Sequence, residues 1–241
     1  MTSKIWRDRC SQMHVLVWWG WDLVAKKRLS PNCKSFLQCK GFFMFRLMAA
    51  VTHQNQPPRL ETQRLLLRLP QSDDFSSYVD VRRRNQSRFQ PVEPQWSRDA
   101  LGKGGFMRRL RNARSLWQRR AGLAFFIFIK PHHTLIGGIT ASWLDTGRPG
   151  TAMVGYWLDG RYEGQGLMGD ALRSVSTLVH QEHHIRRIEA ACLPHNTRSM
   201  KLLHACGFQR EGYCRSYLKI NGVYEDHVLF ARLHADPLRC E

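Results

Sequence analysis

The sequence contains no apolar run long enough to cross a membrane as a helix. Such a helix needs roughly 18 consecutive apolar residues, and every apolar stretch of this 241-residue chain is shorter. Acidic residues are also scarce, since 19 Asp and Glu stand against 37 Lys and Arg, which gives a net charge of +18 at pH 7. This charge indicates an acidic partner such as nucleic acid or a phosphate-bearing ligand, or simply a basic surface on a soluble protein.

Cysteines are present, but their spacing matches none of the common cysteine sites. Seven occur, none in a C-x-x-C pair and none combined with His at the spacing of a zinc site. We therefore expect no bound metal. The odd number argues against a disulfide scaffold and favours a reducing, cytoplasmic compartment.

Residues 1–47 differ in composition from the rest of the chain. They hold four of the eight Trp, three of the seven Cys, and nine Lys and Arg against two Asp. Their apolar run is short and is not followed by a small-residue cleavage site, so it does not match a secretory signal. We expect residues 1–47 to be a poorly ordered extension upstream of a true start at Met48, with a targeting arm as the alternative. Residues 48–241 are expected to form one domain.

From about residue 60 the hydrophobic pattern alternates between strand and helix periods. It predicts an α+β or mixed α/β fold with an antiparallel front and one parallel crossover. The expected helices cover 73–88, 97–120 and 196–206, a further helix begins at about Gly166 with its last apolar position at Val179, and a proline-broken loop covers 89–96. The expected strands cover 64–69, 123–130, 135–144, 151–158 and 185–193, followed by a hairpin that turns at Asn221-Gly222.

Three glycines, Gly164, Gly166 and Gly169, form the pattern G-x-G-x-x-G, which also occurs in dinucleotide-binding Rossmann folds. That fold requires a buried strand directly before the glycines, yet the charged stretch "DGRYE" stands there. Glu189 follows Gly169 by 20 residues, but it lies too early in its strand to be the ribose-binding acid. A P-loop is excluded because no Gly-Lys-Ser/Thr follows.

The glycine stretch still predicts an anion site of another kind. A strand ends, the glycines turn the backbone, and a helix begins near Gly166. The first N–H groups of a helix have no partner within the helix and, with the helix dipole, attract an anion. An ordinary turn between a strand and a helix is the alternative reading.

The residues around this junction resemble a known family. "GYWLDGRYEGQGLMGDAL" and "PHNTRSMKLLHACGFQREGY", with "LETQRLLLR" before them and "YLKINGVYEDHVL" after them, resemble the GNAT superfamily of acetyl-coenzyme A-dependent N-acetyltransferases. Within it, the likeness is to bacterial ribosomal-protein-alanine N-acetyltransferases, and it covers about residues 58–233. The resemblance implies a mixed, mostly antiparallel central sheet flanked by helices, with strands that splay apart at the coenzyme site.

The resemblance also implies which residues bind acetyl-coenzyme A (acetyl-CoA). The phosphate motif R/Q-x-x-G-x-G/A of the superfamily falls on Glu163, Gly164, Gln165, Gly166, Leu167 and Met168. Glu163 replaces the usual Arg or Gln, and Met168 replaces a small residue. A glutamate near a diphosphate is unfavourable, so we expect Glu163 to point outward.

Further site residues follow from the same resemblance. The strand segment Tyr156, Trp157 and Leu158 is expected to bind the pantetheine arm with its free backbone groups, and Asn196 to touch the coenzyme. Ser199 is expected near the sulfur as the acid, because the tyrosine that many GNAT enzymes use would fall on Leu203. Ser199 has an alternative reading as a helix-capping serine.

The expected reaction is direct attack of an amine on the thioester, through a tetrahedral oxyanion that backbone N–H groups near Leu158 stabilise. A covalent cysteine relay through Cys192 or Cys206 is disfavoured, because both positions are typical of core residues. No carboxylate stands out as the base: Glu93 and Glu189 are weak candidates that also suit solvated or structural roles.

The missing base favours a protein N-terminus as the acceptor. An α-amino group has a pKa of about 7.7–8.0 and a lysine about 10.4, a difference worth roughly 3.5 kcal/mol in presenting the neutral amine. The leading hypothesis is acetylation of the N-terminal alanine of a ribosomal protein. The alternatives are a GNAT enzyme for a small amine and a non-catalytic, RNA-associated module. The basic segments 82–88 and 97–120 are either solvated surfaces or contacts for ribosomal RNA.

Overall fold

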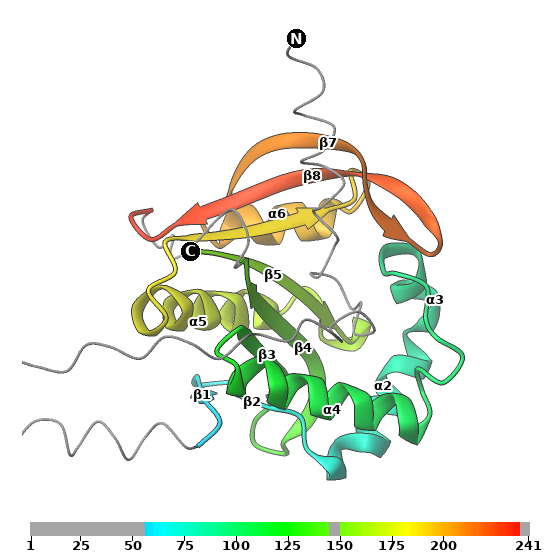
Figure 1. The fold of residues 1–241 in the computed structure, drawn as a ribbon. Helices are drawn as coiled ribbons and strands as arrows, with labels where there is room; N and C mark the ends of the chain where they lie inside the picture. Colours follow the sequence, from blue (N-terminus) through cyan, green and yellow to red (C-terminus); the bar gives the residue numbers. More distant parts are fainter. Residues whose placement is uncertain (1–55, 145–149, 237–241) are drawn as a thin grey trace, which may run out of the picture.

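The computed structural model describes residues 56–144 and 150–236 (Figure 1). The expected extension at residues 1–47 lies outside these residues. Within the described ranges, no helix is both long and apolar enough to cross a membrane.

The described chain folds into an open eight-stranded sheet with the order β1-β2-β3-β4-β5-β6-β8-β7. All neighbouring strands are antiparallel except β5 and β6, which are parallel and joined by a helical crossover. This confirms the predicted mixed, mostly antiparallel architecture. The strands are β1 (Arg59–Glu61), β2 (Leu65–Arg68), β3 (Gly122–Ile129), β4 (Thr134–Trp143), β5 (Thr151–Leu158), β6 (Arg187–Cys192), β7 (Gln209–Ile220) and β8 (Val223–Leu233).

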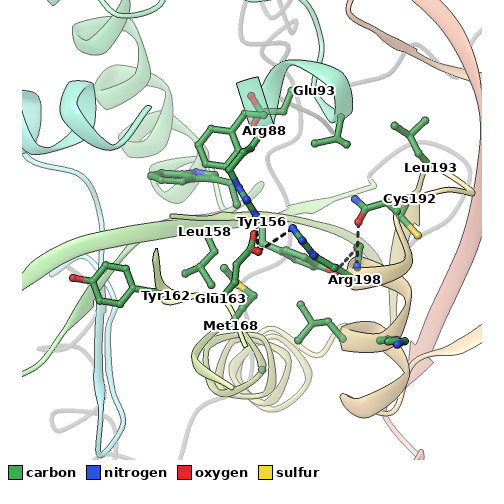
Figure 2. Close-up of a pocket in the computed structure, with 18 of the residues that line it drawn as sticks. Arg88, Glu93, Tyr156, Leu158, Tyr162, Glu163, Met168, Cys192, Leu193 and Arg198 are labelled. Carbon is green, nitrogen blue, oxygen red and sulfur yellow. Dashed lines mark hydrogen bonds and ion pairs between the residues drawn. The ribbon is translucent and has the colours of Figure 1, made fainter. Parts of the chain in front are cut away.

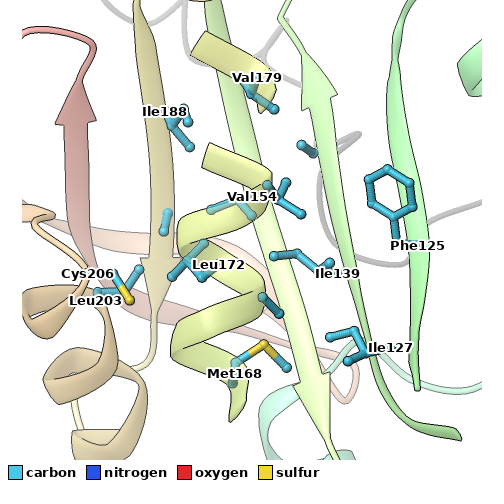
Figure 3. Packing of buried hydrophobic residues seen from close by; sticks show 14 of the residues in the cluster. Phe125, Ile127, Ile139, Val154, Met168, Leu172, Val179, Ile188, Leu203 and Cys206 are labelled. Atoms are coloured by element: carbon cyan, nitrogen blue, oxygen red, sulfur yellow. The ribbon is translucent and has the colours of Figure 1, made fainter. Parts of the chain in front are cut away.

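Helices cover both faces of the sheet because its strands are apolar on both sides. Phe125 and Ile127 of β3 belong to one buried cluster with α5 and α6, whereas Phe126 and Phe128 belong to another with α2, α3 and α4. Figure 3 shows the first cluster between α5 and the strands. The helices are α2 (Phe75–Arg84), α3 (Gln86–Phe89), α4 (Lys103–Gln118), α5 (Leu167–Glu182) and α6 (Thr197–Ala205), with 3-10 turns at Ser72–Asp74, Gln90–Val92 and Gly160–Tyr162.

The prediction that a helix starts at Ser97 was wrong, since α4 begins at Lys103. The Ser97 hydroxyl donates to the Asp99 carboxylate at 3.0 Å instead of capping a helix. The Asp99 carbonyl then accepts from Gly102 N at 2.8 Å, so two turns precede the helix. Because the Ser97 hydroxyl bonds to the Asp99 side chain rather than to a backbone N–H, α4 starts six residues later than predicted.

The predicted helix over 73–88 is divided at Asn85, whose backbone has φ −105° and ψ 12°. The Asn85 side chain donates to Asp159 at 3.0 Å and accepts from Gly160 N at 2.9 Å, just after β5. These long-range bonds attach the helical segment to the end of β5. The short strand β1 was not predicted either, because it has only three residues.

The predicted ends of α6 and the predicted hairpin are confirmed. Asn196 accepts a hydrogen bond from Ser199 N at 3.2 Å and caps α6. Gly207 has φ 82°, and Phe208 N donates back to Leu203 O at 2.9 Å, which closes the helix. Asn221 and Gly222 both have positive φ, as a two-residue hairpin turn requires.

The parallel strands β5 and β6 part after three residue pairs. Thr151, Ala152 and Met153 pair with β6, and the ladder ends there although β5 continues to Leu158. A gap in the centre of the sheet results, and it opens directly beside the start of α5. This is the predicted splay.

Candidate active site

The junction before α5 has the backbone form of an anion site. Gly164 and Gly166 both have φ 73°, in the left-handed region that suits glycine. The first intrahelical bond runs from Asp170 N to Gly166 O at 3.1 Å. The N–H groups of Leu167, Met168 and Gly169 therefore precede the hydrogen-bonded part of a 16-residue helix, at the positive end of its dipole.

Arg64, which lies about 100 residues earlier in the chain, holds this junction in place. Its guanidinium donates to the Gln165 carbonyl at 2.8 Å and to the Asp170 carboxylate at 2.6 Å. Arg173 donates to the other oxygen of Asp170 at 2.9 Å. The single acid in the first turn of α5 is thus neutralised by two arginines, which keeps the helix start attractive to an anion.

The β5 backbone faces the gap with unpaired groups. Asp159 N donates to Ile136 O on β4 at 2.7 Å, and successive residues of a strand turn their backbone groups to alternate sides. The N–H and C=O groups of Leu158 and Tyr156 therefore point away from β4, towards β6, beyond the last β5–β6 pair. A ligand arm in the gap can form with them the bonds that a neighbouring strand would.

The junction and the gap open into one pocket of about 830 Å³ (Figure 2). Eleven of the predicted cofactor residues can be checked against its lining. Gln165 does not line it: its side chain donates to Arg161 O at 3.2 Å on the exposed side of the loop. The predicted residues that do line the pocket are Tyr156, Trp157, Leu158, Glu163, Gly164, Gly166, Leu167, Met168, Asn196 and Ser199.

Two hydroxyl groups meet inside the pocket. The Tyr156 hydroxyl and the Ser199 hydroxyl lie 2.8 Å apart, one from β5 and the other from the first turn of α6. Burial raises the pKa of Tyr156 above its ordinary value, so its proton is retained at neutral pH. This pair can hold a proton next to a group bound in the β5–β6 gap, and the sequence alone did not indicate Tyr156 as the partner of Ser199.

The profile of the Acetyltransferase (GNAT) domain family matches residues 64–209, which is more than half of the chain. The chain belongs to the GNAT acetyltransferase family. This confirms the resemblance inferred from the sequence.

Individual relatives agree with the family profile. The [ribosomal protein uS5]-alanine N-acetyltransferase of Escherichia coli K12 is 32% identical over 173 residues, which are 72% of this chain and 89% of the relative. The structure of the ribosomal-protein-S5-alanine acetyltransferase of Vibrio fischeri has a TM-score of 0.68 and 31% identity, covering 74% and 98% of the two chains. Mycobacterium smegmatis RimJ, solved in complex with CoA-disulfide, has a TM-score of 0.66 and 25% identity, covering 70% and 82%.

In this GNAT domain, Glu163 is bound by two arginines across the pocket mouth. Its carboxylate lies 2.5 Å from an Arg88 nitrogen on α3 and 3.0 Å from an Arg198 nitrogen on α6 (Figure 2). The sequence predicted that Glu163 would point outward to avoid a bound diphosphate. That prediction was wrong, because Glu163 lines the pocket; its two arginine partners offset its charge instead.

The two weak candidates for a base are both held in ion pairs. Glu93 is buried, and its oxygens accept from Arg82 and, at 2.8 Å, from the Trp96 indole. Glu189 accepts from Arg187 at 2.8 Å. Both carboxylates are thus held in ion pairs, and Glu189 does not belong to the pocket lining.

The two cysteines considered for a relay are buried core residues, as the sequence indicated. Burial raises the pKa of Cys192 to about 11 and also raises the pKa of Cys206. A thiol that stays protonated at neutral pH is a poor nucleophile. No cluster of three metal-ligating side chains occurs among residues 56–144 and 150–236.

Proposed function

We propose that this GNAT enzyme transfers the acetyl group of acetyl-CoA to the N-terminal α-amino group of a ribosomal protein, with alanine as the first residue. The observation that carries the proposal is the continuous path in the pocket. It runs from the amide groups of Leu167, Met168 and Gly169, along the β5–β6 gap, to the Tyr156–Ser199 pair. The relatives named for ribosomal-protein alanine acetylation support the acceptor, and such an acceptor is consistent with a cytoplasmic location.

The residues of the pocket fit acetyl-CoA, which supplies an acetyl thioester. The diphosphate would be held by the amides at the start of α5, where Gly164 and Gly166 let the backbone approach closely. The pantetheine arm would bond to the open backbone groups of Tyr156 and Leu158. The amides of this same strand segment would stabilise the negative charge that develops on the carbonyl oxygen.

Ser199 is proposed as the acid that gives a proton to the departing sulfur, with Tyr156 positioning its hydroxyl at 2.8 Å. A positioned acid contributes about 100-fold or more to a rate. We therefore expect Ser199→Ala to lower kcat by about 100-fold. A smaller loss of about tenfold is expected for Tyr156→Phe, which removes one hydrogen bond. A Ser199→Ala enzyme with undiminished kcat would remove Ser199 from this role.

An α-amine is the acceptor that suits this pocket. Glu93, a carboxylate of the pocket lining, is already paired with Arg82, so little negative charge is left to attract a polycationic substrate. A neutral α-amine also needs far less help from a base than a lysine does. The test compares three peptides of one sequence by mass spectrometry, with N-terminal Ala, with N-terminal Ser, and with a blocked N-terminus and one Lys.

Acetylation of the Ala peptide at its N-terminus supports the proposal. Acetylation of only the Lys side chain or of small amines indicates a different class of acceptor. If no amine is acetylated, the remaining hypothesis is a non-catalytic module. Incubation of the protein with ribosomes and labelled acetyl-CoA then identifies the modified terminus.

The ribosome contact is proposed from α4. Its exposed arginines include Arg111 and Arg114, and two more, Arg119 and Arg120, follow its end. By contrast, the basic run 82–88 is largely used within the fold, because Arg82, Arg84 and Arg88 pair with Glu93, Asp159 and Glu163. Association with ribosomes that weakens steeply with salt supports the contact, since phosphate contacts release counterions. A double Arg111→Glu, Arg114→Glu variant should lose it.

A further inference from the structure

A buried histidine lines the pocket and is not used by the chemistry proposed above. His227 lies in β8, is 2% exposed, and belongs to the lining of the pocket that also contains Ser199. Its neighbour Val228 belongs to the buried cluster under α5 and α6. Because successive side chains of a strand point to opposite faces, His227 is directed to the other face of the sheet.

This places His227 and Ser199 on different sides of the β5–β6 gap. Ser199 belongs to α6, and its partner Tyr156 packs on the α5–α6 side. The pocket continues through the gap to the other face, where Phe89 and Trp157 line it. A thioester in the gap would therefore have the serine on one side and the histidine on the side open to an acceptor.

The hydrogen bonding of His227 defines which nitrogen can act. Its Nδ1 lies 2.9 Å from the Glu225 carbonyl oxygen, and a carbonyl can only accept, so Nδ1 carries a proton. In the neutral ring the lone pair is then on Nε2. Burial lowers the pKa of His227 below its ordinary value of 6.5, so the ring is neutral at pH 7 and above.

The groups around His227 come from three strands and the pocket. Glu225 and Asp226 precede it in β8, Cys214 is opposite it in β7, and the Tyr217 ring lies edge-on at 5.8 Å. The two acids act to raise its pKa, and desolvation outweighs them. Cys192 of β6 pairs with the next residue of β8.

The other titratable groups of the pocket lining cannot serve as a base near neutral pH. Glu93 and Glu163 are bound by arginines. Tyr156 and Cys192 keep their protons because burial raises the pKa of both groups. Arg88, Arg198 and Lys201 carry only hydrogen-bond donors in their side chains, and Tyr162 contributes a phenol rather than an imidazole.

Resting on the proposed function, we propose that His227 Nε2 is the general base, which takes the proton that the acceptor amine loses as its nitrogen bonds to the acetyl carbon. The amine enters neutral and forms the C–N bond with its lone pair. The C–S bond breaks with its electron pair on sulfur, which takes the Ser199 proton. His227 then releases its proton to water and Ser199 regains one from water, so both residues end unchanged.

The experiment measures kcat/KM against pH for the Ala-terminated peptide with wild-type protein and His227→Gln. The variant should lose about 100-fold at pH 7.5, in line with the contribution of one general base. Its loss should shrink as pH rises, because hydroxide then takes the proton that the attacking amine loses. The wild-type profile should show an acid limb from the histidine, and the variant should lack that limb.

His180→Gln is the matched control. His180 is also buried, its Nδ1 lies 2.6 Å from the Ile185 carbonyl, and burial lowers its pKa, yet it does not line the pocket. Its substitution should leave the pH profile unchanged. A His227→Ala variant, rescued by added imidazole while the His180→Gln protein is not affected, gives a second readout that a packing role would not produce.

The two proposals fail in different ways. Wild-type protein that acetylates no α-amine overturns the proposed function, whatever His227 does. If the wild-type protein acetylates the peptide and the His227→Gln variant has an equal kcat/KM and an identical pH profile, only the general-base role of His227 is overturned. Acetyl-CoA binding by the variant, measured by calorimetry, shows that the pocket is intact, and imidazole that fails to rescue His227→Ala also counts against it.

Discussion

The two ends of the pocket are built in different ways. The end at α5 consists mainly of one short segment, residues 163–169, whose backbone turns into the start of the helix, and Gln165 alone of this segment lies outside the lining. The opposite end joins side chains from separate segments, including Phe89, Glu93 and His227. A site made of backbone depends on local conformation, whereas a site made of side chains depends on how distant segments pack.

Glu93 shows how the second end is held together. Its carboxylate binds Arg82 of α2 and the Trp96 indole, and its carbonyl accepts from Asn221 N at 2.9 Å. One residue thus links a helix, a loop and the β7–β8 turn. Damage to the two ends of the pocket should therefore have separate consequences.

The largest effect is expected from Glu93→Gln. The side chains of Arg82 and Glu93 are only 3% and 4% exposed, so the variant leaves a buried cation without its counter-charge. The free energy of unfolding should fall by about 3–5 kcal/mol, measured by urea denaturation. Glu61→Gln, in exposed pairs with Arg59 and Lys130, should change it far less, because solvent screens both pairs. Equal losses would contradict the structural role of the buried pair.

Gly166→Val comes next and acts on the other end. A β-branched residue at φ 73° is strained by about 1–3 kcal/mol, and its Cβ would lie 3.4 Å from the Arg64 guanidinium, which holds the junction in place. Acetyl-CoA affinity should fall by about 100-fold in calorimetry, a change of roughly 2.7 kcal/mol. Gly212→Val, at a half-buried position of β7 where an added Cβ meets no atom within 4 Å, is the control and should bind normally. Unchanged affinity of the Gly166 variant would place the diphosphate elsewhere.

Glu163→Gln should have a smaller effect in the opposite direction. It removes a negative charge at the pocket mouth and releases Arg88 and Arg198 to interact with phosphate. Partly exposed pairs contribute about 0.2–1 kcal/mol, so affinity for acetyl-CoA should rise by up to about fivefold at low salt. Glu211→Gln, which breaks the pair with Arg187 outside the pocket lining, should not change it. Weaker binding by Glu163→Gln would show that the carboxylate itself serves the ligand.

The smallest effect concerns how the stability of the whole domain depends on pH, to which histidines inside and outside the pocket both contribute. Burial lowers the pKa of His180, His183 and His227 below 6.5. Below that pH the unfolded chain binds protons that the folded protein excludes, so the free energy of unfolding should decrease as pH falls from 6.5. Above pH 6.5 the histidines are neutral in both the folded and the unfolded chain, so this loss of stability is absent. Thermal unfolding between about pH 5.5 and 7.5 measures this, and His180→Gln should flatten the curve. A stability that rises on acidification would contradict the burial of neutral histidines.

Much of the fold was predictable because local preferences determine it. The glycine junction before α5, the Asn196 cap and the Asn221-Gly222 turn each depend on a few adjacent residues. The alternation of apolar residues also predicted strands such as β5 correctly, with bounds of Thr151–Leu158. The start of α4 was missed because Ser97 bonds to Asp99 rather than to the helix.

The sequence by itself determined the family, the order of the elements and the glycine junction before α5, since short stretches of backbone and their side chains encode all three. Only the tertiary structure decided which side chains meet. Tyr156 lies 43 residues from Ser199, and Arg64 lies 106 residues from Asp170, yet each pair is in hydrogen-bond contact. Such pairs depend on strand order and register, which are set by the packing of the whole sheet rather than by any local pattern.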